Sequence, residues 1–201
     1  DDFRIYNKPL TEDEIEELYE SYEWHRNMKI EDNFVEEEEF KKLQGILMGN
    51  QLEWRFNNSI DGLEGEENKF QFIHVFYSHH GHNMHPHLMV YFGSIIRKLK
   101  MLAIYRIKAN LLTRTPTIVK NMFHVDIDMT KASEETMKLF KTSIFYVNTN
   151  NGYTEFEDGT IVESVANRMV TFPSNIRHTG TSCTDEMSRV VVNFNYVTDL
   201  K

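Results

Sequence analysis

The chain has 201 residues, which suits one domain with one core, and its 40% hydrophobic and 26% charged residues are typical of a globular protein. Acidic residues outnumber basic ones by 31 to 22, and the resulting net charge of -9 disfavours binding to the phosphate backbone of nucleic acids. The single cysteine, Cys183, excludes an intrachain disulfide and fits a reducing compartment, although a secreted protein without disulfides would look the same.

Targeting and membrane signals are weak along this sequence. The first ten residues, DDFRIYNKPL, lack the basic start and the apolar run of a signal peptide. The longest apolar stretch, around 88–96, is far too short to span a bilayer. We therefore expect a cytoplasmic protein without a membrane span.

Three helices are predicted in the first half of the chain. Thr11 and Glu14 form a capping box that opens an acidic helix over about 12–22. Apolar residues at helical spacing predict a second helix over about 33–48 and a third over about 87–99. These helices would pack against the sheet that the later residues predict.

Short strand patterns occupy most of the remaining sequence. Turn signals at Asn151-Gly152, Asp158-Gly159 and Pro173-Ser174-Asn175 separate them, and such spacing favours a sandwich or barrel. We expect one domain over 1–201, with helical support and outer strands in 1–100 and the β core in 101–201. The predicted strands cover about 52–57, 70–77, 101–112, 121–127, 142–148, 153–157, 160–165, 168–173 and 189–197.

The triplet His124-Val125-Asp126 is the first candidate for chemistry. On a strand, residues two apart point to the same face, so the imidazole and the carboxylate would converge as two ligands of a metal site. His178 is the candidate third ligand, because it follows a turn where a new strand begins. Asp128 is better suited to supporting the site or facing solvent. By itself the triplet also fits a surface histidine beside a turn carboxylate.

Arg189 lies eleven residues after His178, at the start of the apolar run RVVVNFNYV. A charge in a buried strand needs a partner, because an unpaired buried charge is costly. A structural carboxylate, Glu186 or Asp185, is one candidate partner. The other is the distal carboxylate of a dicarboxylate ligand, which an arginine fork binds with two parallel hydrogen bonds.

The order H-x-D, then a distal histidine, then an arginine resembles the iron(II)/2-oxoglutarate-dependent dioxygenases. The stretch SIFYVNTNNGYTEF, over 143–156, is similar to their prolyl-hydroxylase branch, and FPSNIRHTG matches its strand, turn and distal histidine. The resemblance covers about 103–197. It implies a mainly β fold with flanking helices and a double-stranded β-helix core of the jelly-roll or cupin type.

The resemblance also implies roles for individual residues. His124, Asp126 and His178 would bind Fe(II), which leaves three positions on the metal for 2-oxoglutarate and O2. The cosubstrate residues would be Arg189 and Tyr146 at the C5 carboxylate, Asn193 on the same face as Arg189, and Asn110 at the C1 end. The segment 113–121 is longer than the resemblance implies, so Arg114 and Lys120 are alternatives to Asn110.

The implied activity is that of a dioxygenase, a hydroxylase that acts on a peptide or a small molecule and releases succinate and CO2. Ascorbate is a candidate stimulant of the reaction. The alternative is a non-catalytic, cupin-like protein that binds a metal, or a structural or interaction protein with a histidine-rich loop. The sequence does not identify the substrate or the oligomeric state.

Two further patterns bear on the site. The run SHHGHNMHPH holds His79, His80, His82, His85 and His87, and we expect a polar loop near the mouth of the site rather than a second metal centre. Strand alternation before the triplet puts Arg106, Lys108 and Asn110 on one face and Tyr105, Ile107 and Ala109 on the other. The basic face would either make the cavity positive, suited to anionic ligands, or form a solvent-facing stripe.

Overall fold

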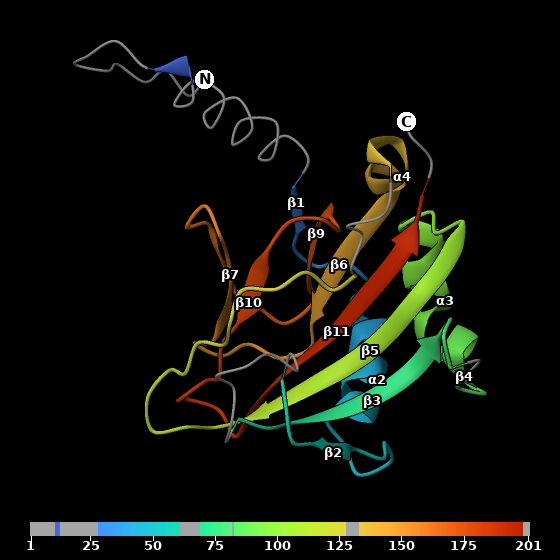
Figure 1. Cartoon of the computed structure of the whole chain (residues 1–201). Coiled ribbons are helices and arrows are strands. Elements are labelled where there is room, and N and C mark those ends of the chain that lie inside the picture. The colour runs from blue at the N-terminus through green and yellow to red at the C-terminus, as the bar shows by residue number, and fades with distance from the viewer. Residues whose placement is uncertain (1–10, 13–27, 61–68, 82, 128–132, 199–201) are drawn as a thin grey trace.

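Two antiparallel sheets organise the computed structural model, which describes residues 11–12, 28–60, 69–81, 83–127 and 133–198 (Figure 1). The major sheet contains, in spatial order, β1 (Lys29–Glu31), β9 (Arg168–Pro173), β6 (Phe140–Tyr146), β11 (Ser188–Val197), β5 (Ala103–Thr113), β3 (Gln71–Ser78) and β2 (Arg55–Asn57), and β4 (Asn83–Met84) pairs with β3. The minor sheet contains β10 (His178–Gly180), β7 (Tyr153–Phe156) and β8 (Ile161–Glu163). Two antiparallel sheets with these crossovers form a jelly-roll double-stranded β-helix, which confirms the predicted fold class.

Two helices cover one face of the major sheet, while the minor sheet lies over the other face (Figure 1). These helices are α2 (Glu37–Leu47) and α3 (Leu88–Lys98), and a short helix, α4 (Glu134–Leu139), leads into β6. The predicted third helix and the predicted strands at β5, β7 and β9 match the structure to within a few residues. Among the described residues, no helix is long and apolar enough to cross a membrane.

The period of two along the strands sorts side chains between the two faces of the major sheet. On β11, Val190, Val192 and Phe194 pack on the helix side, whereas Val191 packs toward the minor sheet. On β5, Ile107 belongs to the helix-side core. The helix side is therefore mainly apolar, and polar residues of the same strands, such as Asn193 and Asn110, face the space between the sheets.

The predicted second helix begins later than expected. Asn33 has φ = 50°, a left-handed conformation that ends any helix, and the next two residues are not helical. The backbone amide of Phe34 donates to the carbonyl of Asn167 at 2.9 Å, and that of Val35 donates to Asn167 Oδ1 at 3.0 Å. These two contacts hold the segment against the sheet, so helix α2 starts only at Glu37.

The strand predicted over 121–127 is wrong. The segment makes only isolated bridges, Lys120 with Thr181 and His124 with His178, and then bends. Reciprocal backbone hydrogen bonds of 3.0 Å join His124 and His178, so the segment touches the minor sheet at this point without continuing as a strand.

Some predictions fall outside the described residues. All of the predicted first helix over 12–22 except Glu12 lies there, and so does Asp128. The organisation of 1–201 as one domain stays a prediction. Within the described ranges, β1, β2 and β3 extend the major sheet at its two edges, so the first hundred residues contribute strands as well as helices.

Candidate metal centre and ligand cavity

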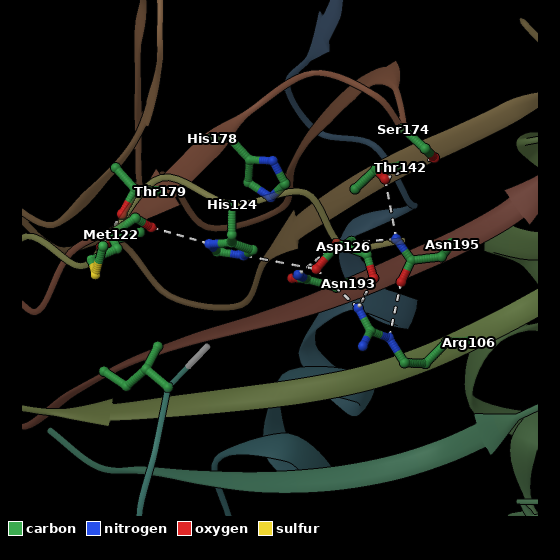
Figure 2. Close-up of polar contacts among 12 residues, drawn as sticks. Arg106, Met122, His124, Asp126, Thr142, Ser174, His178, Thr179, Asn193 and Asn195 are labelled. Carbon is green, nitrogen blue, oxygen red and sulfur yellow. Dashed lines mark hydrogen bonds and ion pairs between the residues drawn. The ribbon is translucent and has the colours of Figure 1, made fainter. Parts of the chain in front are cut away.

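The three residues predicted as metal ligands converge on one point between the sheets (Figure 2). His124 and Asp126 come from the segment that follows β5, and His178 is the first residue of β10. One ligand atom from each lies within 4.8 Å of the other two. The paired backbones of His124 and His178 set the spacing of the two imidazoles, whose ring centroids are 4.9 Å apart.

Both imidazoles are oriented by backbone carbonyls. His124 Nδ1 lies 3.2 Å from the carbonyl oxygen of Met122, and His178 Nδ1 lies 3.1 Å from that of Ile176. Because a carbonyl only accepts, each Nδ1 donates and the lone pair of the neutral ring lies on Nε2. His178 Nε2 is buried and has no hydrogen-bond partner. This is the arrangement of a metal-binding histidine whose other nitrogen is fixed by an outer partner.

Asp126 completes the set as a buried carboxylate with three donors. Arg106 Nη2 donates to Oδ1 at 2.9 Å, and the side-chain amides of Asn193 and Asn195 donate to Oδ2 at 3.2 and 3.0 Å. Burial acts to raise the pKa of Asp126, but the charge of Arg106, with smaller effects of His178, outweighs it and holds the pKa well below its usual range. Asp126 is therefore ionised, the form that binds a metal.

The donors to Asp126 are themselves held in place. Arg106 Nε donates to Asn195 Oδ1 at 3.0 Å, and Asn195 Nδ2 also donates to Thr142 Oγ1 at 3.1 Å (Figure 2). Asn195 was missed by the sequence analysis. The signal that could have found it is strand alternation, because it follows Asn193 by two residues on β11.

A cavity of about 510 Å³ opens beside the three residues, a size suited to small ligands. The predicted residues Arg189, Asn193 and Asn110 all line it, as do Arg106 and Lys108. The basic face of β5 therefore points into the cavity and is not a solvent-facing stripe. Its other lining residues include Ile60, Gln71, Leu112, Asn121, Phe123, Ile144, Thr154, Arg177 and Val191.

Arg189 is 3% exposed and is held by hydroxyl groups rather than by a carboxylate. Its Nε donates to Ser164 Oγ at 2.7 Å and its Nη2 to Thr154 Oγ1 at 3.1 Å. Neither Glu186 nor Asp185 pairs with it, and no other carboxylate does within the described part of the chain. Burial lowers the pKa of Arg189 from its ordinary value, yet a guanidinium stays charged in proteins.

Tyr146 lies behind this arginine and does not itself line the cavity. Its hydroxyl donates to Thr154 Oγ1 at 2.8 Å, and the Arg189 guanidinium carbon lies 5.7 Å from its ring centroid. Burial raises the pKa of Tyr146, against the lowering effect of Arg189, so the phenol is neutral. Tyr146 and Arg189 thus share Thr154, and a direct contact of Tyr146 with a ligand stays a prediction.

Glycine allows the close packing around Arg189. A Cβ atom on Gly152 would lie 2.7 Å from Arg189 Cδ, 2.7 Å from the carbonyl oxygen of Ser182 and 2.8 Å from Asn150 Oδ1. Such distances are too short for real contacts, so only glycine fits here. The sequence marked Gly152 as a turn residue, whereas its contacts tie it to the arginine.

Asn110, Arg114 and Lys120 were the three candidates for the C1 end of the cosubstrate, and of these Asn110 faces the cavity. Its Oδ1 is buried without a hydrogen-bond partner. Lys120 instead forms an ion pair of 3.0 Å with Glu155, and Arg114 is exposed; neither lines the cavity. Asn110 is therefore the one of these three residues that lines the cavity, and its contact with the C1 end of a cosubstrate stays a prediction.

The residues present fit a metal and a polar ligand. Two imidazoles and one carboxylate on one face are the donor set of non-haem Fe(II) oxygenases, which leaves open positions on the metal. Three polar atoms of the cavity are buried without partners: His178 Nε2, Asn110 Oδ1 and Asn193 Oδ1. Buried polar groups without partners are rare in folded proteins, and three of the four found among the described residues lie around this one cavity.

The histidine-rich run does not lie at this cavity, contrary to expectation. Of its described histidines, none lines the cavity. His80 Nε2 lies 2.5 Å from the hydroxyl of Tyr105, and the rings of His85 and His87 lie 5.5 and 5.8 Å from that of Tyr91 on α3. In the described part of the chain, the only group with ligand atoms close enough for a metal is His124, Asp126 and His178.

Comparisons with known proteins identify the fold. No protein-family model and no curated protein matches the sequence. A prolyl-4-hydroxylase from Pseudomonas putida superposes with a TM-score of 0.55 at 14% identity, over 86% of this chain and 93% of that chain. An oxidoreductase of the 2OG-Fe(II) oxygenase family from Burkholderia pseudomallei gives 0.60 at 9% identity, over 97% and 93%.

A third solved structure agrees with these two. The viral collagen prolyl hydroxylase of Paramecium bursaria Chlorella virus-1 superposes with a TM-score of 0.54 at 11% identity, over 98% of this chain and 97% of that chain. The predicted resemblance is confirmed at the level of structure: the chain has the fold of prolyl hydroxylases and 2OG-Fe(II) oxygenases.

Proposed function

We propose that this chain is an Fe(II)- and 2-oxoglutarate-dependent dioxygenase that hydroxylates a peptide or a small molecule. The observation that carries the proposal is one cavity that holds both a metal-ligand set and a buried arginine without a carboxylate partner in the described structure. An ion pair of Arg189 with a structural carboxylate would not explain the missing carboxylate partner or the metal-ligand set in the same cavity. A dicarboxylate cosubstrate that binds a metal at one end and an arginine at the other explains both.

His124, Asp126 and His178 would hold the iron. The two imidazoles need no rearrangement, because their Nδ1 atoms already donate to carbonyls. Asp126 keeps its negative charge and its orientation through Arg106, Asn193 and Asn195. When bound there with 2-oxoglutarate, Fe(II) would supply the activation of O2 that oxidises a substrate C–H bond and releases succinate and CO2.

Arg189 would bind the C5 carboxylate of 2-oxoglutarate. Ser164 and Thr154 accept from its Nε and Nη2, which fixes the plane of the guanidinium, and Nη1 would donate to the carboxylate. Tyr146 supports the same end through Thr154. An arginine held in advance loses little conformational entropy when the carboxylate binds.

Asn193 and Asn110 lie between the metal ligands and Arg189 on neighbouring strands. Val191, which pairs with Asn110 in the register of β11 and β5, separates Arg189 from Asn193. The unpartnered Oδ1 atoms of both asparagines make them candidates for contact with the cosubstrate or its bound water. Apolar side chains of Ile144, Val191 and Leu112 line the same region, and they would exclude water from the reacting end.

The proposal is tested by adding 2-oxoglutarate to the purified protein with Fe(II) in the absence of O2. A weak visible absorption band is expected when the cosubstrate binds the iron through two oxygen atoms. On admission of air, succinate should form slowly even without a substrate, and ascorbate should sustain it. A metal-binding protein of the cupin type without oxygenase activity would show neither the band nor succinate.

Matched variants test whether His124 binds the metal and whether Arg189 binds the cosubstrate. His124→Ala should lose both the band and succinate formation, and Arg189→Ala should need far more 2-oxoglutarate for either. Arg97→Ala removes an exposed arginine on α3 and serves as the control, with both signals kept. If His124→Ala and Arg189→Ala keep full turnover, the site is assigned to the wrong residues.

A further inference from the structure

The two carboxylate oxygens of Asp126 have different surroundings (Figure 2). Oδ2 accepts hydrogen bonds from the side-chain amides of Asn193 at 3.2 Å and Asn195 at 3.0 Å. Oδ1 accepts from Arg106 Nη2 at 2.9 Å and lies 3.9 Å from His124 Nε2. The amide donors therefore gather on one oxygen, while the other oxygen lies near a second metal ligand.

The orientation of the Asn195 amide is fixed by its partners. Arg106 Nε donates to Asn195 Oδ1 at 3.0 Å, and a guanidinium has no acceptor. Asn195 Nδ2 therefore carries the two hydrogens that go to Asp126 Oδ2 and, at 3.1 Å, to Thr142 Oγ1. Because Asn195 is fully buried and uses all of its polar atoms, it presents Nδ2 to Asp126 in a single orientation.

The orientation of the Asn193 amide follows from Asp126 itself. An ionised carboxylate only accepts, so the atom of Asn193 beside Asp126 Oδ2 is the amide nitrogen and not the oxygen. Asn193 Oδ1 is then directed away from the carboxylate, and it is buried at the cavity without a partner among the described residues. Neither asparagine can turn its amide over without setting an oxygen against the carboxylate.

These contacts leave Asp126 with one oxygen to offer a metal. Each oxygen of an ionised carboxylate has two lone pairs. The amides of Asn193 and Asn195 use both lone pairs of Oδ2, whereas Arg106 uses one of those of Oδ1. Oδ1 can therefore bind a metal with every hydrogen bond kept, but Oδ2 can bind one only if an asparagine is displaced.

The binding mode of this carboxylate decides how many positions on the metal stay open. Carboxylates bind cations through one oxygen or through both. If Asp126 uses one oxygen, the three protein ligands fill three of about six positions and 2-oxoglutarate fills two more, which leaves one position for O2. If Asp126 uses both oxygens, the protein and the cosubstrate together fill every position.

We propose that Asn193 and Asn195 are positioning residues that restrict Asp126 to metal binding through Oδ1, and so keep one coordination position open beside bound 2-oxoglutarate. This inference rests on the proposed function and deepens it. Asn195 carries the cleaner test, because it is fully buried and does not line the cavity. Any effect of Asn195 on the coordination of the metal therefore passes through its contacts with Asp126 and Arg106.

The test counts the exchangeable water molecules on Mn(II) bound to the full chain, from the transverse relaxation of ¹⁷O in water. The wild type should hold about three waters with Mn(II) alone and about one with saturating 2-oxoglutarate. Asn195→Leu keeps the size of the side chain and removes the donor, so Asp126 Oδ2 should reach the metal. We expect about two waters with Mn(II) alone and none with 2-oxoglutarate.

A second buried asparagine serves as the matched control for loss of a structural amide. Asn148 donates to the carbonyl of Ser188 at 2.8 Å, accepts from the backbone amide of Val190 at 3.0 Å, and does not line the cavity. Asn148→Leu should leave both water counts unchanged. If Asn195 were merely structural, Asn195→Leu would weaken Mn(II) binding and leave the hydration of the bound ion as in the wild type, which would overturn the inference.

Asn193→Ala is the second variant, and it decides the question if Asn195→Leu does not fold. The substitution frees one lone pair of Asp126 Oδ2 while Asn195 and Arg106 stay in place. It should lower both water counts in the same direction as Asn195→Leu. Counts equal to those of the wild type in either folded variant overturn the inference.

The two proposals fail in different ways. If Mn(II) or 2-oxoglutarate does not bind to the wild type in separate titrations, the proposed function falls and the inference falls with it. If both bind and the wild type holds no water beside 2-oxoglutarate, or the variants match it, the inference alone is overturned and the oxygenase assignment stands.

Discussion

A group of histidines lies on each side of the major sheet, and in the described part of the chain only one of the two groups is arranged to bind a metal. On the cavity face, His124 and His178 meet Asp126. On the helix face, His74 and His85 have ring centroids 5.3 Å apart, and His87 lies beside His85 at 5.8 Å. His74 belongs to the helix face because it pairs in register with Ala109, which packs in the helix-side core.

The helix-face group shares some features with the metal centre. His74 Nδ1 lies 2.8 Å from the carbonyl oxygen of Glu53, and its Nε2 is buried without a partner. The helix-face group differs from the metal centre in two respects: in the described residues it has no carboxylate, and its ligand atoms do not converge on one point. No carboxylate of the described residues joins the helix-face group, and its rings pack with Phe76 and Tyr91 as aromatic groups.

The comparison teaches that the number of histidines near one another does not identify a metal centre. His85 Nδ1 accepts from the backbone amide of His87, so the hydrogen of its neutral ring lies on Nε2. That tautomer does not direct a lone pair toward His74. The cavity-face pair directs both Nε2 atoms toward an ionised Asp126, which supplies the negative charge that a cation needs.

The largest expected effect is on metal binding. His124→Ala should weaken the affinity for Mn(II) by more than the roughly 10- to 100-fold that loss of an outer partner costs, because a direct ligand is removed. His85→Ala on the helix face is the matched control and should leave the affinity unchanged. Isothermal titration of both variants decides, and an equal loss in His85→Ala would contradict the distinction between the faces.

The second effect concerns the cation at the far end of the cavity. Arg189→Met should weaken 2-oxoglutarate binding by more than about 100-fold, roughly 3 kcal/mol, since a buried charged partner of the ligand is lost. Metal affinity should be kept. Lys98→Met removes a cation on the helix side, where Lys98 donates to the carbonyl of Phe34, and should not change cosubstrate affinity. A titration of 2-oxoglutarate into the Mn(II) protein measures both, and a similar loss in the two variants would count against the assigned site.

A third prediction compares the effect on stability of substituting a glycine beside the cavity, Gly152, with that of substituting a glycine in helix α2, Gly45. Gly152→Ala should destabilise the protein by about 1–3 kcal/mol, because its Cβ would overlap Arg189 Cδ and a carbonyl oxygen. Gly45→Ala in helix α2 has open space around the new methyl group and should stabilise by about 0.5–1 kcal/mol. Thermal unfolding measures both. Gly152→Ala should also weaken 2-oxoglutarate binding, and an unaltered affinity would show that Arg189 needs no support from this turn.

The smallest effect is a pH dependence on the helix face. Burial, together with the nearby His74 and His87, lowers the pKa of His85 below its ordinary value near 6.5. The unfolded chain therefore binds the proton more readily, so this contribution to stability is fully present above about pH 6.5 and is lost as the pH falls below it. His85→Phe keeps an aromatic ring and removes the titration. Its melting temperature relative to that of the wild type should rise as the pH falls from 7 to 5, and a constant difference would contradict the prediction.

Periodic features of the sequence determined much of the site. Alternation along β11 predicted that Arg189 and Asn193 share a face, and alternation along β5 predicted the same of Arg106, Lys108 and Asn110. All five line the cavity, in agreement with the alternation within each strand. Side-chain direction in a strand follows from local geometry, so a short stretch of sequence is enough to predict it. The order of His124, Asp126, His178 and Arg189 also predicted which fold would bring them together.

Tertiary structure alone decided how those residues are held. Asn195 reaches Asp126 across 69 positions of sequence, and Ser164 reaches Arg189 across 25, so no local pattern encodes either contact. The register between strands sets such contacts, and the register depends on the packing of both faces. The same reason explains why the segment of His124 bends instead of forming a strand. The sequence by itself determined which side chains share one face of their strand, because that follows from local geometry. The packing of distant strands decided which face lines the cavity and which residues become ligands or supports, because those contacts depend on register.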